Sequence, residues 1–202
     1  MGHREKLLAG AKRCLYERGY GRTTARDIVE VSGTNLASIG YHFGTKEALL
    51  DAAMMEAVGE WGEELERILA AEGDEYADPM ERFEAIWTRV IGSFEAHRPA
   101  LIASFEAFVR AQHAPELRAR ISAAHEESRL WLAELYRRFG GTSSEESARA
   151  VGSFYLALLN GLMMQWMLDP DRALSGHDIS EALGKITEDL QPTERQSAKT
   201  KS

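Results

Sequence analysis

The chain has 202 residues, enough for one domain or two small ones, and 44% of them are hydrophobic, so it can bury a substantial core. Its single cysteine, Cys14, excludes an internal disulfide and suits a reducing compartment. The N-terminus is charged and lacks the apolar run of a secretory signal, and the most apolar stretch, residues 154–168, is too short for a membrane span. We therefore expect a cytoplasmic protein that makes no contact with a membrane.

The net charge of −8 is unevenly distributed. Residues 1–48 hold eight Lys or Arg and five Asp or Glu side chains, a net charge of +3, which leaves −11 for the remainder. A basic segment can bind phosphates while an acidic body repels non-specific nucleic acid. The distribution therefore permits DNA binding by the N-terminal segment, despite the sign of the total charge.

The first predicted helix runs from about Arg4 to Arg18, and a Gly-Tyr-Gly sequence ends it. Apolar side chains recur at helical spacing on one of its faces. Because Cys14 lies on this face, we interpret it as a core residue rather than a reactive thiol. The apolar face consists of Leu7, Leu8, Ala11, Cys14 and Leu15.

Two short helices are predicted next, over residues 24–31 and 35–43, with a break at Ser32-Gly33 between them. A second break at Gly44-Thr45 precedes a longer helix, for which Thr45 is the expected N-cap. Two short helices joined by a tight glycine-containing turn form a helix-turn-helix, whose second helix can enter the major groove of DNA. The longer helix that begins after Thr45 keeps its apolar spacing to about residue 68, so it would link this segment mechanically to the rest of the chain.

This segment resembles the DNA-binding segment of TetR-family transcriptional regulators. The matching residues are Gly19, Tyr20, Thr23, Thr24, Asp27, Ile28, Ser32, Gly33 and the run Tyr-His-Phe-Gly-Thr-Lys-Glu-Ala-Leu-Leu at 41–50. The match covers roughly the first fifty residues, and beyond them only length and helical character agree. The resemblance implies an all-α protein, with a three-helix DNA-binding domain over 1–48 and a helical ligand-binding and dimerisation domain over 49–190.

The expected DNA contacts follow from the helix positions. Ile39 and Phe43, four residues apart, should point inward, which leaves the opposite side of the second short helix to face the groove. Ser38 could bond base edges, and Leu36 and Ala37 could touch thymine methyl groups. Thr24, at the start of the first short helix, is placed for phosphate binding, for N-capping or for both, and Asn35 is the expected N-cap of the second short helix. The resemblance gives backbone contacts to Thr24, Tyr41, His42 and Lys46. The predicted contact residues are Thr24, Asn35, Leu36, Ala37, Ser38, Tyr41, His42 and Lys46.

Gly40 departs from the family pattern, which often has an aromatic residue at this position. A glycine inside a helix costs about 1 kcal/mol relative to alanine. Two interpretations stay open: the glycine allows close approach to DNA, or it only loosens the helix. No Arg, Asn or Gln stands in the interior of this helix, so the sequence predicts no operator.

Helices are also predicted around residues 83–94 and 101–109, and over 115–139, 145–168 and 178–190, whereas the polar residues 191–202 should be disordered. Aromatic and methionine side chains recur on these helices, either as ordinary core or as the lining of a cavity for a mostly apolar or aromatic ligand, as the resemblance implies. A cationic aromatic ligand would suit the acidic body. The expected ligand contacts are Phe83, Trp87, Phe105, Phe108, Trp131 and Met164.

A homodimer is expected through 145–168 and 178–190, since the first of these helices is apolar on more sides than one core can cover. Small residues such as Gly152 and Gly161 would let helices approach closely.

The six histidines are scattered, and no phosphate-binding glycine loop, nucleophile elbow or metal-ligand pattern is present, so no catalytic residue, metal or cofactor is predicted. The favoured function is a repressor that a small effector releases from its DNA operator. The alternatives are a related regulator without a small effector, which a protein partner switches or which acts as an activator, and a helical-bundle enzyme with a DNA-binding head.

Overall fold

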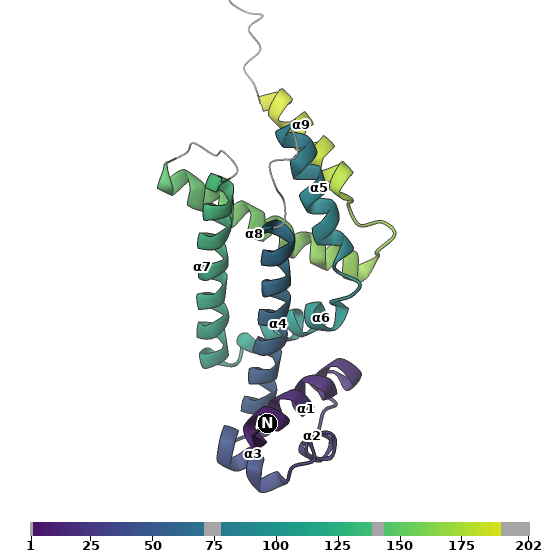
Figure 1. Ribbon diagram of the computed structural model, residues 1–202, viewed down its shortest axis with the longest axis vertical. Helices are drawn as coiled ribbons and strands as arrows, with labels where there is room; N and C mark the ends of the chain where they lie inside the picture. The colour runs from purple at the N-terminus through teal and green to yellow at the C-terminus, as the bar shows by residue number, and fades with distance from the viewer. Residues whose placement is uncertain (1, 71–77, 139–143, 191–202) are drawn as a thin grey trace, which may run out of the picture.

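The computed structural model describes residues 2–70, 78–138 and 144–190, and every regular element within these ranges is an α-helix (Figure 1). The prediction of an all-α fold is confirmed. The predicted disorder of residues 191–202 lies outside the described residues. The helices are α1 (His3–Arg18), α2 (Ala25–Ser32), α3 (Leu36–Phe43), α4 (Lys46–Ala70), α5 (Pro79–Gly92), α6 (Arg98–Ala111), α7 (Pro115–Arg138), α8 (Glu145–Leu168) and α9 (Gly176–Leu190).

Side-chain caps fix where several of these helices begin. Thr24 and Asn35 cap α2 and α3, and the Thr45 hydroxyl accepts a hydrogen bond from the Ala48 N–H at the start of α4. Asp78 caps α5 and Ser144 caps α8 in the same way. Each cap satisfies a backbone donor that the first turn of a helix leaves without a partner. The short α2 and α3 depend most on these caps, because eight residues make few intrahelical bonds.

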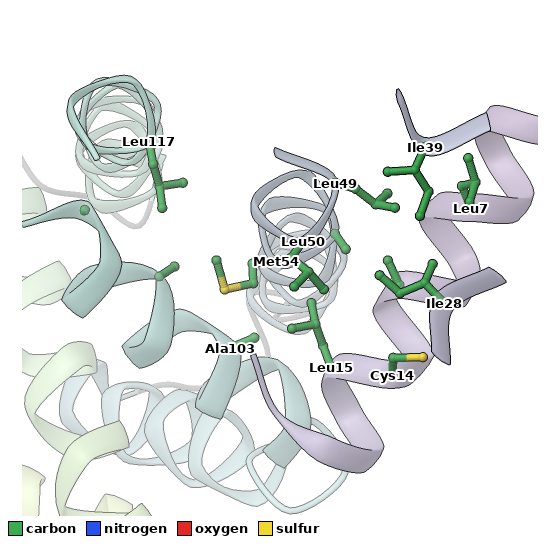
Figure 2. Packing of buried hydrophobic residues seen from close by; sticks show 14 residues of the cluster. Leu7, Cys14, Leu15, Ile28, Ile39, Leu49, Leu50, Met54, Ala103 and Leu117 are labelled. Carbon is green, nitrogen blue, oxygen red and sulfur yellow. The ribbon is translucent and has the colours of Figure 1, made fainter. Parts of the chain in front are cut away.

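The head of the molecule consists of α1, α2, α3 and the first turns of α4. Its core is built from completely buried aliphatic side chains, among them Leu7, Ile28 and Leu49, and the thiol of Cys14 lies among them as predicted (Figure 2). The turn between α2 and α3 passes through Gly33, whose φ of 63° favours glycine over any residue with a Cβ. The turn sets α3 against α1 and α4, with its outer side free.

The head core does not end at residue 48. Leu50, Ala53 and Met54 of α4 belong to it, as do Ala103, Ala107 and Ala111 of α6 and Leu117 of α7. Figure 2 shows Ala103 and Leu117 in the same cluster as Met54 and Leu15. The small alanine side chains let α6 lie close to the head. The head therefore shares one hydrophobic core with α6 and the start of α7.

A second core cluster holds the body together. It is aromatic: the Phe94 ring lies 6.3 Å from the Trp61 ring and 5.7 Å from the Trp166 ring, centroid to centroid. The sequence placed Phe94 on the helix that begins near Phe83, but α5 ends at Gly92 and Phe94 lies, completely buried, in the turn before α6. The cluster joins α4, α5, α6, α7, α8 and α9.

The head lies at one end of the molecule, and α4 runs from it into the body (Figure 1). Within the body α7 packs mainly on α8, and α5 packs mainly on α9. At Gly152 of α8 an added Cβ would lie 2.4 Å from the carbonyl oxygen of Arg129. The close approach predicted at Gly152 for a second copy is therefore made to α7 of the same chain. A Cβ added at Gly161 would meet no heavy atom of the described residues within 4 Å.

By length and composition alone, α8 would be able to cross a membrane, the one such helix in the described parts of the chain. The test is a weak one, because core helices of soluble proteins also meet it. Here α8 carries Arg149, which pairs with Glu126 of α7, and its Leu162, Met163 and Trp166 are buried in the body.

Candidate nucleic-acid interface

The N-terminus of α2 is fixed by a reciprocal cap. The Thr24 hydroxyl accepts a hydrogen bond from the Asp27 N–H (3.2 Å), and the Asp27 carboxylate accepts one from the Thr24 N–H (2.8 Å). Hydrogen bonds from the Thr24 backbone and hydroxyl lower the pKa of Asp27, and an ion pair with Arg18 acts in the same direction. Thr24 is exposed and caps the helix as predicted, but its hydroxyl is already engaged.

The N-terminus of α3 is built around Asn35. Its Oδ1 accepts hydrogen bonds from the backbone N–H of Ser38 (3.0 Å) and from the Ser38 hydroxyl (3.1 Å). The Ser38 oxygen also lies 3.3 Å from His3 Nδ1 of α1. Ser38 is buried between these partners. The prediction that Ser38 lies on the groove side is therefore wrong: the cap turns its side chain toward α1.

The outer side of α3 carries Leu36, Ala37, Gly40 and Tyr41. The Leu36 side chain is 52% exposed and that of Tyr41 85%, and both Ala37 and Gly40 are exposed. Ile39 is buried and Phe43 packs on the head core, so the predicted inward direction of these two is confirmed. The His42 ring is half-buried and meets Tyr41 edge to face, with 4.8 Å between ring centroids. The most exposed surface of the helix is thus apolar, apart from the Tyr41 hydroxyl.

Lys46 stands at the first position of α4. Its Nζ donates a hydrogen bond to the Thr23 carbonyl oxygen (3.2 Å) and lies 3.4 Å from the Glu47 carboxylate. The buried Thr23 hydroxyl in turn donates to the Gly19 carbonyl oxygen (2.8 Å). Lys46 therefore ties the start of α4 to the segment before α2. An ammonium group has three donors, so these contacts leave capacity for a phosphate.

The N-terminus of α1 borders α3, a feature that the sequence did not reveal. Besides the contact from His3, the Arg4 guanidinium lies over the Phe43 ring, 5.3 Å from its centroid. Arg4 and Lys6 are exposed, as are Arg22 and Arg26 near the start of α2. No local pattern marks this neighbourhood, because it depends on how α1 crosses the other two helices.

A polar cluster, the junction, joins the head to the body and consists of Tyr20, Asp51, Glu106 and Arg110. The Tyr20 hydroxyl donates to Asp51 of α4 (3.1 Å), and the Tyr20 N–H donates to Glu106 of α6 (3.2 Å). Arg110 of α6 lies over the Tyr20 ring (4.7 Å) and pairs with Asp51 (3.4 Å). Burial, with a smaller effect from the Asp51 carboxylate, raises the pKa of the Tyr20 phenol. The one available sequence signal was Asp51, the sole charged residue of the run 48–55.

The six predicted ligand contacts do not come together around one cavity. Phe83 and Trp87 pack on each other and on Tyr155, with centroids 6.1 to 6.4 Å apart, and Phe105 and Trp131 join the body cluster. Phe108 is 58% exposed and Met164 51% exposed, so their predicted place in an enclosed lining is wrong for the single chain. These two residues lie on sides of α6 and α8 that no other part of the described chain covers.

Two open recesses lie on the body surface. One, between α5 and α9, is lined by Glu81, Glu84, Ala85, Thr88, Arg89 and His177. The other lies on α6 beside the junction and is lined by Tyr20, Phe105, Glu106, Val109 and Arg110. Phe105 is the one predicted ligand contact that lines either recess. Within the described residues, no group of three or more His, Cys, Asp or Glu side chains could hold a metal ion.

The geometry defines a class of protein: a helix-turn-helix head with an exposed second helix, carried on an all-helical body. Residues 7–53 match the family model of bacterial regulatory proteins, tetR family, and residues 78–189 match the model of the tetracyclin repressor-like C-terminal domain. The chain belongs to the TetR family of DNA-binding transcriptional regulators.

Known proteins match this chain over most of its length, in sequence or in fold. The HTH-type transcriptional regulator TtgR of Pseudomonas putida is 26% identical over 179 residues, which covers 83% of this chain and 81% of TtgR. A transcriptional regulator from Streptomyces coelicolor superposes with a TM-score of 0.70 at 22% identity, over 92% of this chain and 98% of that one. The multidrug binding protein EbrR in complex with proflavin gives a TM-score of 0.63 at 22% identity, over 92% of this chain and 99% of EbrR.

Proposed function

We propose that this protein is a homodimeric repressor that acts in the cytoplasm and leaves its operator when a small, mostly apolar effector binds the body. The observation that carries this proposal is the shared core: α6 is both a body helix and a part of the head core. A ligand shifts an equilibrium only if it binds one conformation better than another. Any effector that moves α6 or α4 would displace the head with it.

In the proposed complex α3 lies in the major groove, where Leu36 and Ala37 face the bases. Thr24, Tyr41, His42 and Lys46 border this face, where phosphates would lie. Helix N-termini such as those of α2 and α4 favour anions, and exposed arginines beside them add attraction for the DNA backbone. The apolar outer side of α3 would contact the bases, and the basic side chains around it would contact the phosphate backbone.

The dimer is proposed to form on the uncovered side of α8. Exposed or half-buried residues recur there with alternating spacings of four and three, which is the spacing of a seam between packed helices. They are Ala150, Phe154, Ala157, Gly161, Met164 and Leu168. Ile186 and Leu190 leave a similar uncovered strip on α9. A second copy would bury these side chains. Burial in a dimer would explain why α8 is apolar on a side that its own chain leaves uncovered.

The effector is proposed to enter among the aromatic side chains of the body. EbrR, a protein of the same fold, binds proflavin, an aromatic cation, and residues 49–202 of this chain carry a net charge of −11. The indole N–H of Trp61 is buried in this region with no hydrogen-bond acceptor among the described residues. A buried donor without a partner is costly, and an effector with an acceptor group would satisfy it.

A second candidate function is a regulator that a protein partner switches. The close packing of Phe83, Trp87 and Tyr155 favours this candidate, because these rings fill the space in which an effector was expected. Under this alternative the uncovered side chains of α6 would receive the partner. Both candidates keep the same DNA-binding head.

The test uses the purified full chain and a duplex selected by it from a random-sequence pool. Fluorescence anisotropy should give tight, salt-dependent binding, and titration with proflavin should weaken it. A coupling of about 2.7 kcal/mol corresponds to a hundredfold change in affinity, within the ordinary allosteric range. Light scattering should give a dimer. If neither proflavin nor uncharged aromatic compounds change DNA binding, the protein-switched regulator is favoured. A monomer that binds DNA equally well would contradict the dimer.

A further inference from the structure

Gly40 occupies the middle of the outer side of α3, between the exposed Ala37 and Tyr41. Its backbone is ordinary right-handed helix, since the positive φ angles in the described residues belong to Gly19, Gly33 and Gly44. Any L-residue could adopt this conformation. The backbone therefore gives no reason for a glycine here.

Packing within the protein gives no reason either. A Cβ added at Gly40 would meet no heavy atom within 4 Å among the described residues, whereas a Cβ added at Gly152 would collide with α7. Glycine weakens a helix relative to alanine, and α3 has only eight residues. The protein carries a destabilising residue at a position where its own fold would accept a side chain.

The neighbours of Gly40 restrict what this surface can read. The Oδ1 of Asn35 and the hydroxyl of Ser38 are used in the helix cap and against His3, so of these two residues only the amide N–H donors of Asn35, at the edge of the helix, are left for DNA. Leu36 and Ala37 can offer apolar contact only, and Tyr41 offers one hydroxyl. The side chains that commonly read guanine or adenine, Arg, Lys, Asn and Gln, do not occur between Leu36 and Phe43. The group in the major groove that the apolar centre of this surface suits best is the C5-methyl group of thymine.

We propose that Gly40 is a specificity-determining residue, which lets the α3 backbone lie directly against the floor of the major groove so that Leu36 and Ala37 reach thymine methyl groups. The inference rests on the proposed placement of α3 in DNA and names the operator chemistry that this placement would read. An operator of this kind contains A·T pairs at the positions under the centre of α3. A methyl group at residue 40 would hold the helix away from them.

The test compares the wild type with Gly40→Ala and with a matched control, Gly59→Ala. Gly59 is an exposed helical glycine of α4 with no heavy atom of the described chain within 4 Å of an added Cβ. Each alanine should raise the Tm by about 2 to 4 °C through helix propensity. Only Gly40→Ala should weaken binding to the selected duplex, by roughly tenfold or more. Binding of a scrambled duplex at low salt should stay the same for all three proteins.

A second measurement changes the DNA and leaves the protein intact. Replacing thymine by deoxyuracil removes one methyl group, and at a contacted position this should weaken wild-type binding roughly fourfold. If Gly40→Ala binds the selected duplex as tightly as the wild type, or more tightly, the glycine only loosens α3 and the proposal is wrong. If no deoxyuracil substitution matters, methyl readout is wrong. If the wild type enriches no sequence, the proposed placement of α3 in DNA fails first.

Discussion

The head and the body of this protein reach their structures by different routes. In the head, residues close in the sequence satisfy one another: Thr24 with Asp27, Asn35 with Ser38, and Thr45 with Ala48. In the body, the central aromatic contacts join residues far apart, such as Trp61, Phe94 and Trp166. The head is therefore defined by short-range rules, and the body by which helices meet.

The surfaces differ in the same way. The most exposed apolar residues of the head lie on α3, the helix proposed to meet DNA. Those of the body lie mainly on α6, α8 and α9, and their proposed partner is a second copy, an effector or another protein. The function of the head can therefore be argued from the single chain, whereas that of the body depends on molecules outside it. Four experiments test this difference between head and body.

The largest effect is expected where the two regions share their core. Leu50 is completely buried at the point where α4 leaves the head, and Leu50→Ala should lower the free energy of unfolding by about 2 to 5 kcal/mol. The matched change Leu36→Ala, on the exposed side of α3, should cost less than about 0.5 kcal/mol. Urea denaturation at a fixed protein concentration measures both values. Two separate unfolding transitions would contradict a core common to head and body.

The structure of the head could largely be predicted from the sequence, apart from the direction of the Ser38 side chain. The boundaries of α1 to α4 and the caps Thr24, Asn35 and Thr45 could be predicted, because helix periodicity and capping are local properties. Ser38 was misplaced because the inner side of an eight-residue helix depends on its rotation, which the Asn35 cap and His3 fix. One residue of rotation moves a side chain from one surface to the other.

In the body, periodicity found the helices but not their partners. Phe108 and Met164 share the helical spacing of core residues, yet no described element covers them. Gly152 was recognised as a site of close approach but assigned to the wrong neighbour. The junction of Tyr20, Asp51, Glu106 and Arg110 brings together residues up to 90 positions apart in the chain. Such contacts follow from topology, which spacing alone does not specify.

The next effect concerns the DNA surface. Replacing both Tyr41 and Lys46 by alanine should weaken operator binding by roughly tenfold or more and should reduce the slope of log Kd against log salt concentration by about 1 per head. Both side chains are proposed to contact phosphate, but only the lysine carries a charge that displaces counterions. Lys185→Ala, an exposed lysine of α9, is the control and should change neither value. Unchanged affinity and salt dependence in the double variant would remove both residues from the DNA interface.

A smaller effect is expected at the junction. Asp51 and Arg110 are partly buried and share Tyr20 as a third partner, so a double-mutant cycle to alanine should give a coupling of about 1 kcal/mol in the free energy of unfolding. The control cycle uses Glu134 and Arg137, an exposed pair on α7, which should couple by less than about 0.5 kcal/mol. Equal couplings would mean that the junction is an ordinary surface pair. A lower operator affinity in Arg110→Ala would show that the junction also affects DNA binding by the head.

The smallest effect is a pH dependence confined to the body. A hydrogen bond to Glu84, together with its charge, raises the pKa of His177 above its ordinary value of 6.5, and Asp178 and Glu181 add smaller contributions. Because the folded state holds the proton more tightly, this stabilisation is fully present below the unfolded pKa and is lost as the pH rises through the folded one. The Tm of the wild type should therefore exceed that of His177→Gln at about pH 5.5, and the difference should vanish near pH 9.

Since the His177–Glu84 pair is exposed, the difference in Tm should also shrink in high salt. Glu84→Gln should remove the same increment, and operator binding measured at one pH should be equal in all three proteins. A difference in Tm that grows with pH would reverse the sign and exclude the His177–Glu84 pair as its source.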